Sequence, residues 1–303
     1  MKCKGQNIVS FFLFNNSLVV SIPDSLCSLT LLTYINLRDN KLVGTIPSCL
    51  ANLTQLNYLD LSYNQLTGTI PPLDTLPLNL LKLNNNGLGG HLIANPYWDY
   101  VDISSNTLKG SIPSGFFSPS LLLVSLDSNK LTGTIPSTIG SCQNLTLLTM
   151  SINSLSGSIP YQLGSLSLLQ NLNLNTNSLN DVIPSSLWRS SNLQYLNLYK
   201  NSLVGSIPPE ISNLINVTYL NLSYNNITGI PSEIFVLGQL RNLYLGYNNI
   251  TGTTPSMIGK SLNILSLRYN QLTGTISTFN DNNHLTYLDF PNNSISGTIP
   301  DFL

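Results

Sequence analysis

The residue types that most often carry catalysis are sparse and far apart in this 303-residue chain. The only two histidines, His91 and His284, lie in opposite halves, which leaves no histidine pair for a metal and no sensible Ser-His-Asp spacing. Asp60 and Asp102 occupy equivalent positions of a repeating pattern, with Lys82 between them. Paired carboxylates do acid–base work inside a cleft, which an open sheet does not provide. We therefore predict no catalytic residue, no metal ligand and no cofactor.

Residue types suited to binding gather instead in the C-terminal half. Tyrosine and arginine dominate binding hot spots, and the equivalent positions in the middle of the chain hold serine and threonine. The predicted ligand-binding residues are Tyr195, Tyr199, Lys200, Tyr219, Tyr224, Tyr244, Tyr247, Arg268 and Tyr269. The alternative is that these tyrosines only pack across neighbouring strands, as Tyr34, Tyr58 and Tyr100 would.

A repeat of about 24 residues must position these side chains. Its marker is the asparagine of Leu-x-x-Asn, at Asn16, Asn40, Asn64, Asn86, Asn106, Asn129, Asn153, Asn177, Asn201, Asn225, Asn248, Asn270 and Asn293. Repeats of this length stack into a solenoid because none can bury its apolar face alone. The sequence therefore predicts one elongated array over residues 1–303, of about thirteen coils.

The coil around Asn201 shows the predicted local structure. Leu193, Leu196 and Leu198 alternate with polar residues, a pattern that indicates a short strand with one buried face. A buried Asn201 would bond backbone groups of its own and the next coil. After the turn, Pro209-Glu210-Ile211 predicts a short helical segment on the convex side. Parallel strands would then line the concave side, in a β-rich α/β solenoid.

Composition excludes several classes of function. Charged residues make up only 8% and the formal net charge is −1, so no basic surface exists to attract nucleic acid. No apolar run is long enough to span a membrane. Ile8 to Phe14 follows two lysines and mimics a short signal peptide, but Ile8, Phe11 and Leu13 match the repeat, so we assign this segment to the first coil.

The four cysteines divide into a candidate pair and two single residues. Cys27 and Cys49 lie 11 and 9 residues after their repeat asparagines, so adjacent coils place them close together on the convex side. A disulfide and two buried thiols are both open alternatives. Cys142 has no candidate partner and is predicted to be a buried thiol, while Cys3 would pair upstream of the chain.

The segment Leu61-Ser62-Tyr63-Asn64-Gln65-Leu66-Thr67-Gly68-Thr69-Ile70-Pro71 resembles the plant-type leucine-rich repeat, Leu-x-Leu-x-x-Asn-x-Leu-x-Gly-x-Ile-Pro, and the resemblance covers nearly the whole chain. It implies a curved superhelix with a second short sheet, outside the cell or at its surface. Residues 1–7 are similar to the end of an N-terminal cap, and no C-terminal cap is recognisable, so we expect a fragment. Relatives of this kind include receptor-kinase ectodomains, polygalacturonase-inhibiting proteins and a few ice-binding proteins.

We therefore expect a non-catalytic module that binds a peptide or protein on its concave face, with a co-receptor as a further partner. The alternatives are a secreted inhibitor of a cell-wall hydrolase and, with less support, an ice-binding protein. Thr-Gly-Thr turns at 67–69, 132–134, 251–253 and 273–275 suggest the last, although Leu92, Val182 and Gly229 interrupt them. A glycosylation sequon at Asn221 lies within the predicted binding face, where a glycan would obstruct it.

Overall fold

The computed structural model describes residues 8–279 and 284–300, and the chain divides into two compact units, Met1–Ser154 and Leu155–Leu303. Both units are built from the same coil, so each is described by itself. Whether the array acts as one domain stays a prediction. The expected cap remnant at residues 1–7, with Cys3, and the last three residues lie outside the described residues.

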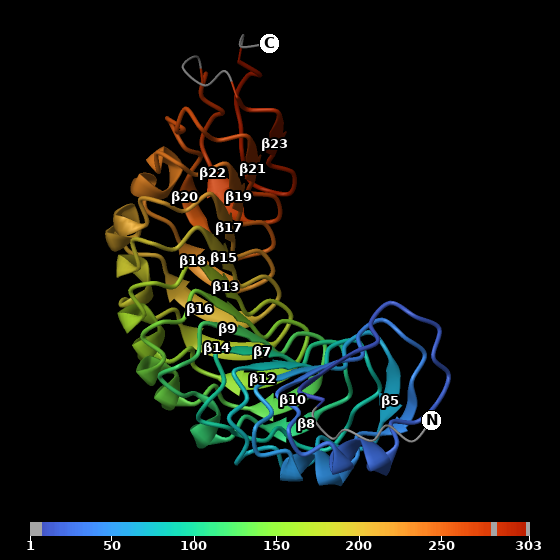
Figure 1. Ribbon diagram of the computed structural model, residues 1–303. Coiled ribbons are helices and arrows are strands. Elements are labelled where there is room, and N and C mark those ends of the chain that lie inside the picture. The colour runs from blue at the N-terminus through green and yellow to red at the C-terminus, as the bar shows by residue number, and fades with distance from the viewer. Residues whose placement is uncertain (1–7, 280–283, 301–303) are drawn as a thin grey trace. The chain divides into compact units, whose positions relative to one another are not determined.

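Thirteen short strands of the main sheets, one for each repeat asparagine, run parallel in chain order and confirm the predicted solenoid (Figure 1). The first unit holds β1 (Ser10–Phe12), β2 (Tyr34–Asn36), β4 (Tyr58–Asp60), β6 (Leu80–Lys82), β7 (Tyr100–Asp102), β9 (Leu123–Ser125) and β11 (Leu147–Thr149). The second holds β13 (Asn171–Asn173), β15 (Tyr195–Asn197), β17 (Tyr219–Asn221), β19 (Asn242–Tyr244), β21 (Ile264–Ser266) and β23 (Tyr287–Asp289). Ser10 pairs with Tyr34, so the segment from Ile8 is the first coil, as predicted.

In most coils a second short strand follows the turn. The first unit pairs β3 (Val43–Thr45) with β5 (Gln65–Thr67) and β8 (Lys109–Ser111) with β10 (Lys130–Gly133). The second unit pairs β12 (Ser154–Gly157, starting at the boundary), β14 (Ser178–Val182), β16 (Ser202–Ser206) and β18 (Asn226–Gly229) in turn, and separately β20 (Thr251–Thr253) with β22 (Gln271–Thr273). These strands supply the second set of short strands that the family resemblance implied, divided among three sheets and not joined in one.

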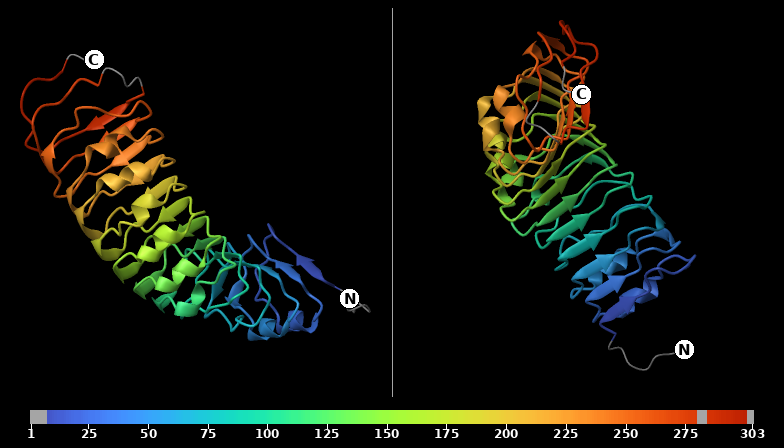
Figure 2. Two further views of the ribbon diagram at one scale, coloured as in Figure 1. Left: turned by 90° about the vertical axis from the view of Figure 1, so that its left-hand side faces the viewer. Right: turned by 90° about the horizontal axis from the view of Figure 1, so that it is seen from above.

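Single 3-10 turns complete the coils on the side away from the main strands in each unit (Figure 2). They are η1 (Asp24–Ser28), η2 (Ser48–Asn52), η3 (Ser114–Phe116), η4 (Ser137–Ser141), η5 (Tyr161–Ser165), η6 (Leu187–Arg189), η7 (Pro209–Asn213) and η8 (Ser232–Val236). The predicted helical segment at Pro209 is η7. A proline precedes most of these turns, because its fixed φ suits the entry to a helical turn.

The repeat asparagines hold successive coils together through buried hydrogen bonds. Asn225 donates from Nδ2 to the carbonyls of Leu198 and Leu222 at 3.0 Å each, and its Oδ1 accepts the backbone N–H of Leu203 at 3.0 Å. Leu198 and Leu203 belong to the preceding coil. The prediction of a backbone-bonding asparagine is confirmed, but the neighbouring coil it contacts is the previous one rather than the next.

The residue directly before each repeat asparagine has a left-handed backbone, with φ between 52° and 57° in all thirteen coils. None of these residues is glycine, and L-residues pay for this conformation because Cβ crowds the backbone. The sharp turn therefore stores strain, which the asparagine bonds offset. Tyr224, Tyr247 and Tyr269 are among these residues, so the turn also sets the direction in which their side chains project.

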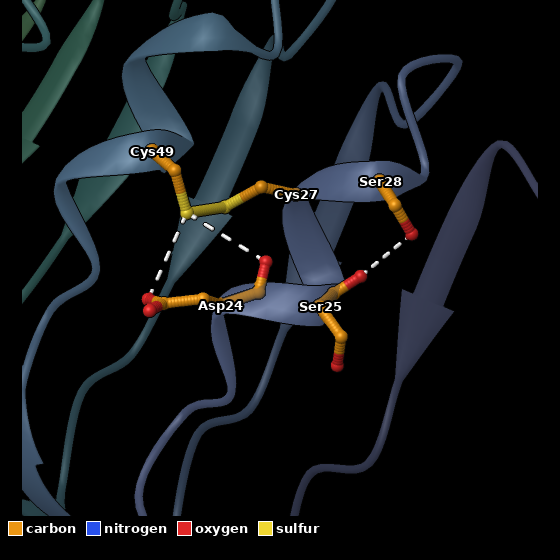
Figure 3. Close-up of a disulfide and its surroundings, with 5 residues drawn as sticks. All are labelled: Asp24, Ser25, Cys27, Ser28 and Cys49. Carbon is orange, nitrogen blue, oxygen red and sulfur yellow. Dashed lines mark hydrogen bonds between the residues drawn. A yellow bond between two sulfur atoms is a disulfide. The ribbon is translucent and has the colours of Figure 1, made fainter.

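Cys27 and Cys49 form a disulfide between η1 and η2, with their Cα atoms 5.9 Å apart (Figure 3). The Asp24 side chain, also in η1, lies next to the Cys49 sulfur. Of the two alternatives, the disulfide is confirmed, and Cys142 is a buried free thiol as predicted.

Trp98 takes the place of a leucine and is fully buried. Within the described ranges, no helix is long and apolar enough to cross a membrane.

Candidate ligand-binding surface

All nine predicted ligand-binding residues lie in the second unit, on four consecutive coils, and the tyrosines among them form two rows. The strand row consists of Tyr195 on β15, Tyr219 on β17 and Tyr244 on β19. The Tyr195 and Tyr219 rings stack with centroids 4.5 Å apart, and Tyr244 follows Tyr219 at 5.6 Å in a tilted arrangement. Tyr244 reaches the row diagonally, since it pairs in register with Asn221 and not with Tyr219.

Asparagines on the same strands hold the hydroxyls of the strand row. Asn197 Nδ2 donates to Tyr195 Oη, and Asn221 Nδ2 donates to Tyr219 Oη, both at 3.2 Å. Each of these asparagines also accepts the backbone N–H two residues further on, so it is fixed at both ends. Burial raises the pKa of the Tyr219 phenol above its ordinary value. The hydroxyls of Tyr195 and Tyr219 are therefore held in fixed orientations.

The turn row consists of Tyr199, Tyr224, Tyr247 and Tyr269. Tyr199 meets Tyr224 edge to face at 5.2 Å, Tyr224 stacks on Tyr247 at 4.0 Å, and Tyr247 stacks on Tyr269 at 4.3 Å. Both faces of Tyr247 are thus covered by other rings. A hydrogen bond with the Tyr224 hydroxyl raises the pKa of the Tyr247 phenol. The inner part of the row offers a ligand ring edges and hydroxyl donors instead of open ring faces.

Two cations accompany the turn row. The Arg268 guanidinium lies 5.3 Å from the centre of the Tyr247 ring, and its Nε lies 3.6 Å from Asp289 Oδ2. Cation–π contact and the ion pair together hold Arg268 in place, although part of its side chain is exposed. Lys200 is exposed at the turn position before Asn201. Sequence reasoning missed Asp289, which the coil register between β21 and β23 could have revealed.

A smaller aromatic cluster in the first unit contains Tyr34 and Tyr58, for which cross-strand packing was expected, together with Phe12 and the Arg38–Tyr63 pair, which were missed. Phe12 and Tyr34 lie 4.7 Å apart, Tyr34 and Tyr58 stack at 3.7 Å, and the Arg38 guanidinium lies 5.1 Å from the Tyr63 ring centre. Burial, followed by a hydrogen bond with Tyr34, raises the pKa of Tyr58. The alternative explanation of the strand tyrosines, cross-strand packing, is therefore correct for their contacts in both units.

The residues considered for catalysis do not form one site. Asp60, Lys82 and Asp102 are neighbours in register on β4, β6 and β7. The two carboxylates accept the hydroxyls of the serines two residues further on, at 2.5 and 2.6 Å. His91 and His284 lie in different units. No group of three His, Cys, Asp or Glu side chains that could hold a metal occurs in the part of the chain described here.

Comparison with known proteins agrees with this architecture. The leucine-rich-repeat family models match residues 6–66, 191–250 and 215–272, and further copies match 120–142 and 284–303. The chain belongs to the leucine-rich-repeat family. Together with the Gly-x-Ile-Pro turns and the plant structures below, this identifies a plant-type repeat protein. A search of curated protein sequences found no match.

Solved plant receptor structures are similar over nearly the whole chain. The ectodomain of the membrane receptor kinase GASSHO1/SCHENGEN3 from Arabidopsis thaliana, in complex with CASPARIAN STRIP INTEGRITY FACTOR 2, is 33% identical, with a TM-score of 0.92 over 97% of this chain. The plant peptide hormone receptor RGFR1 with RGF2 is 32% identical, with a TM-score of 0.89 over 97%. The Arabidopsis receptor kinase HAESA with the peptide hormone IDA and the co-receptor SERK1 is 32% identical, with a TM-score of 0.84 over 97%. This chain covers 37%, 52% and 55% of those three chains.

Proposed function

We propose that this protein is a non-catalytic recognition module whose second unit binds a peptide or protein ligand across the two tyrosine rows, on the concave face. The observation that carries the proposal is the ordered surface of seven tyrosines and Arg268 on consecutive coils. Preorganised aromatic side chains give contact area at low entropic cost. The bound peptides of the similar plant receptors support the same class of ligand.

The phenol hydroxyls and the neighbouring cations favour a ligand rich in hydrogen-bond acceptors. The phenols with raised pKa values stay protonated and donate, and Lys200 and Arg268 add positive charge near the two ends of the turn row. A peptide backbone or a carboxylate supplies such acceptors. A co-receptor is a further proposed partner, because one of the similar structures contains one. The disulfide and these neighbours favour an extracellular location or one at the cell surface.

The Asn221 sequon needs to stay unmodified for this surface to work. Asn221 Nδ2 already donates to the Tyr219 hydroxyl, so a glycan on this nitrogen would replace one of its two hydrogens and crowd the ring. We propose that Asn221 carries no glycan. Glycopeptide mass spectrometry of protein secreted from plant cells would contradict this proposal if Asn221 were occupied in most molecules.

The test is a binding screen with synthetic peptides of about 12 residues, long enough in extended form to cross four coils. For any peptide that binds, we expect the double variant Tyr244→Ala, Arg268→Ala to lose at least about tenfold in affinity. The matched control is Tyr34→Ala, Arg38→Ala, which removes the same residue types from the first unit. Full affinity in the Tyr244→Ala, Arg268→Ala variant, or the absence of any binder in the screen, would contradict the proposal.

The alternatives predict different assays. A cell-wall hydrolase inhibitor would reduce the activity of a polygalacturonase mixed with the protein. An ice-binding protein would need a continuous threonine face, but the strands that carry Thr-Gly-Thr here, β5, β10, β20 and β22, are divided among three different sheets. An ice-recrystallisation assay tests that alternative directly.

A further inference from the structure

The second sheet of the second unit is interrupted where one coil is a residue short. Pro208 lies seven residues after Asn201, whereas Pro231 lies six after Asn225. The pairing of β16 with β18 accordingly shifts between Gly205 and Ser206. β18 is the last strand of its sheet, and β20 begins another. The backbones of these two coils therefore diverge beyond their turns.

The missing residue leaves open space above Gly252. A Cβ built on Gly205 would lie 2.9 Å from Val182 Cγ1, and one on Gly274 would lie 3.6 Å from Thr253 Cβ, because a side chain of the preceding coil covers each glycine. A Cβ on Gly252 would meet nothing within 4 Å. The covering side chain is the one that the short coil lacks.

The result is a hollow of about 350 Å³ between η8 and β20, lined in part by Ile230, Phe235, Val236, Thr254 and Met257. Thr254 occupies the position of the buried Ile207 two coils earlier, and its hydroxyl donates to the Thr275 carbonyl. The shorter side chain enlarges the space. Met257 is 68% exposed and Val236 48% exposed, so the apolar surface continues outside the hollow.

An acidic group stands beside this apolar surface. Glu233, in the first turn of η8, is half-buried at the rim and accepts the Ser232 hydroxyl at 3.1 Å. Among the residues that the structure describes, the only ion pair joins Arg268 and Asp289, so Glu233 has no cationic partner within that part of the chain. The site is separate from the tyrosine rows, since η8 and β20 line it and the main strands do not.

We propose that this hollow, together with Glu233, is a second docking site, and that it takes an aliphatic side chain of a partner protein that lies directly next to a lysine or arginine. The apolar lining fits the aliphatic group, and the unpaired carboxylate fits the cation. Exposed Met257 and Val236 extend the contact beyond the hollow, which favours a protein segment over an enclosed small molecule.

Methionine methyl groups provide a sharp test, because the chain has only three methionines. With ¹³C-methyl methionine, the Met257 signal reports on the hollow and buried Met150 serves as an internal control; Met257→Leu assigns the signal. The probes are Ac-Gly-Leu-Lys-Gly-NH₂ and Ac-Gly-Leu-Glu-Gly-NH₂. We expect a saturable shift of Met257 with the lysine peptide, about fivefold weaker binding of the glutamate peptide, and no shift of Met150.

Variants separate the two parts of the site. Glu233→Gln should weaken the lysine peptide by about three- to fivefold, while the control Glu210→Gln, at the same position of the neighbouring coil in η7, should not. Thr254→Ile restores the larger side chain and should weaken both peptides. An unmoved Met257, equal affinity for both peptides, or full binding by Thr254→Ile with an unchanged Met150 signal would overturn the proposal.

Discussion

The strand tyrosines look alike in the two units, but the turn tyrosines do not. Tyr34 and Tyr58 stack across β2 and β4 much as Tyr195 and Tyr219 stack across β15 and β17. At the left-handed turn position, however, the first unit has a single tyrosine, Tyr63, while the second has three in succession. Strand stacking is thus a property of the repeat, and the turn row is particular to the second unit.

The two units also differ in how their coils are held. The first unit carries the disulfide, between η1 and η2, and a buried free thiol at Cys142. Cysteine is absent from the second unit, which relies on packing and the asparagine bonds. The comparison therefore separates covalent stabilisation in one unit from a specialised surface in the other.

Replacing Cys27 and Cys49 by serine should lower the stability of the first unit by about 3 kcal/mol, the expected effect of opening a loop of this length. Amide hydrogen exchange is the suitable measurement, because repeat arrays unfold locally. Protection should fall in the coils around η1 and η2 and stay unchanged in the second unit. Equal loss in both units would show that the two are not independently stabilised.

Raising the pH above 9 should destabilise the first unit through Cys142. Burial raises the pKa of this thiol from 9.0 to about 11. Between these values the unfolded thiol ionises while the folded one does not, so stability present below pH 9 falls by roughly 2 kcal/mol by pH 11. Denaturant titrations at pH 8, 9, 10 and 11 measure this. Cys142→Ala should show a shallower pH dependence than the parent, although raised tyrosine pKa values contribute in both; parallel curves would exclude a role for Cys142.

The double variant Tyr224→Leu, Tyr247→Leu should weaken binding of a screened peptide by about tenfold, because it removes the stacked centre of the turn row but keeps apolar bulk. The same change at Tyr34 and Tyr58 should alter affinity less than about twofold. Isothermal titration calorimetry of both variants gives the comparison. If the first-unit variant lost as much affinity, the binding surface would include Tyr34 and Tyr58 and would not be particular to the second unit.

Ile152→Asn should stabilise the first unit by about 1 kcal/mol. Ile152 is β-branched and holds a left-handed backbone at φ 52°, and asparagine tolerates this region better. At Tyr247 the same substitution should give no gain, since it also removes two stacked contacts. Thermal unfolding of both variants checks the pair. Destabilisation by Ile152→Asn would indicate that the exposed isoleucine makes contacts worth more than the backbone strain.

The sequence alone determined the coil, its number and the surface that each residue occupies. This was possible because a period-two pattern at a fixed spacing leaves one register in which the leucines are buried. Trp98 shows the strength of this constraint, since it stands at a leucine position of the repeat and is fully buried. The same spacing placed Cys27 close to Cys49, but it did not decide between a disulfide and two buried thiols.

Tertiary structure decided how side chains on different coils meet. Tyr244 joins the strand row diagonally, Arg268 lies over Tyr247 and pairs with Asp289, and the space above Gly252 opens because one residue is missing from the previous coil. The repeat pattern places these residues on adjacent coils, but it is the same whichever rotamer a surface residue adopts, so it does not determine the contacts themselves. Burial of leucines is set by periodicity, whereas ring stacking and open space depend on distances between particular atoms in adjacent coils.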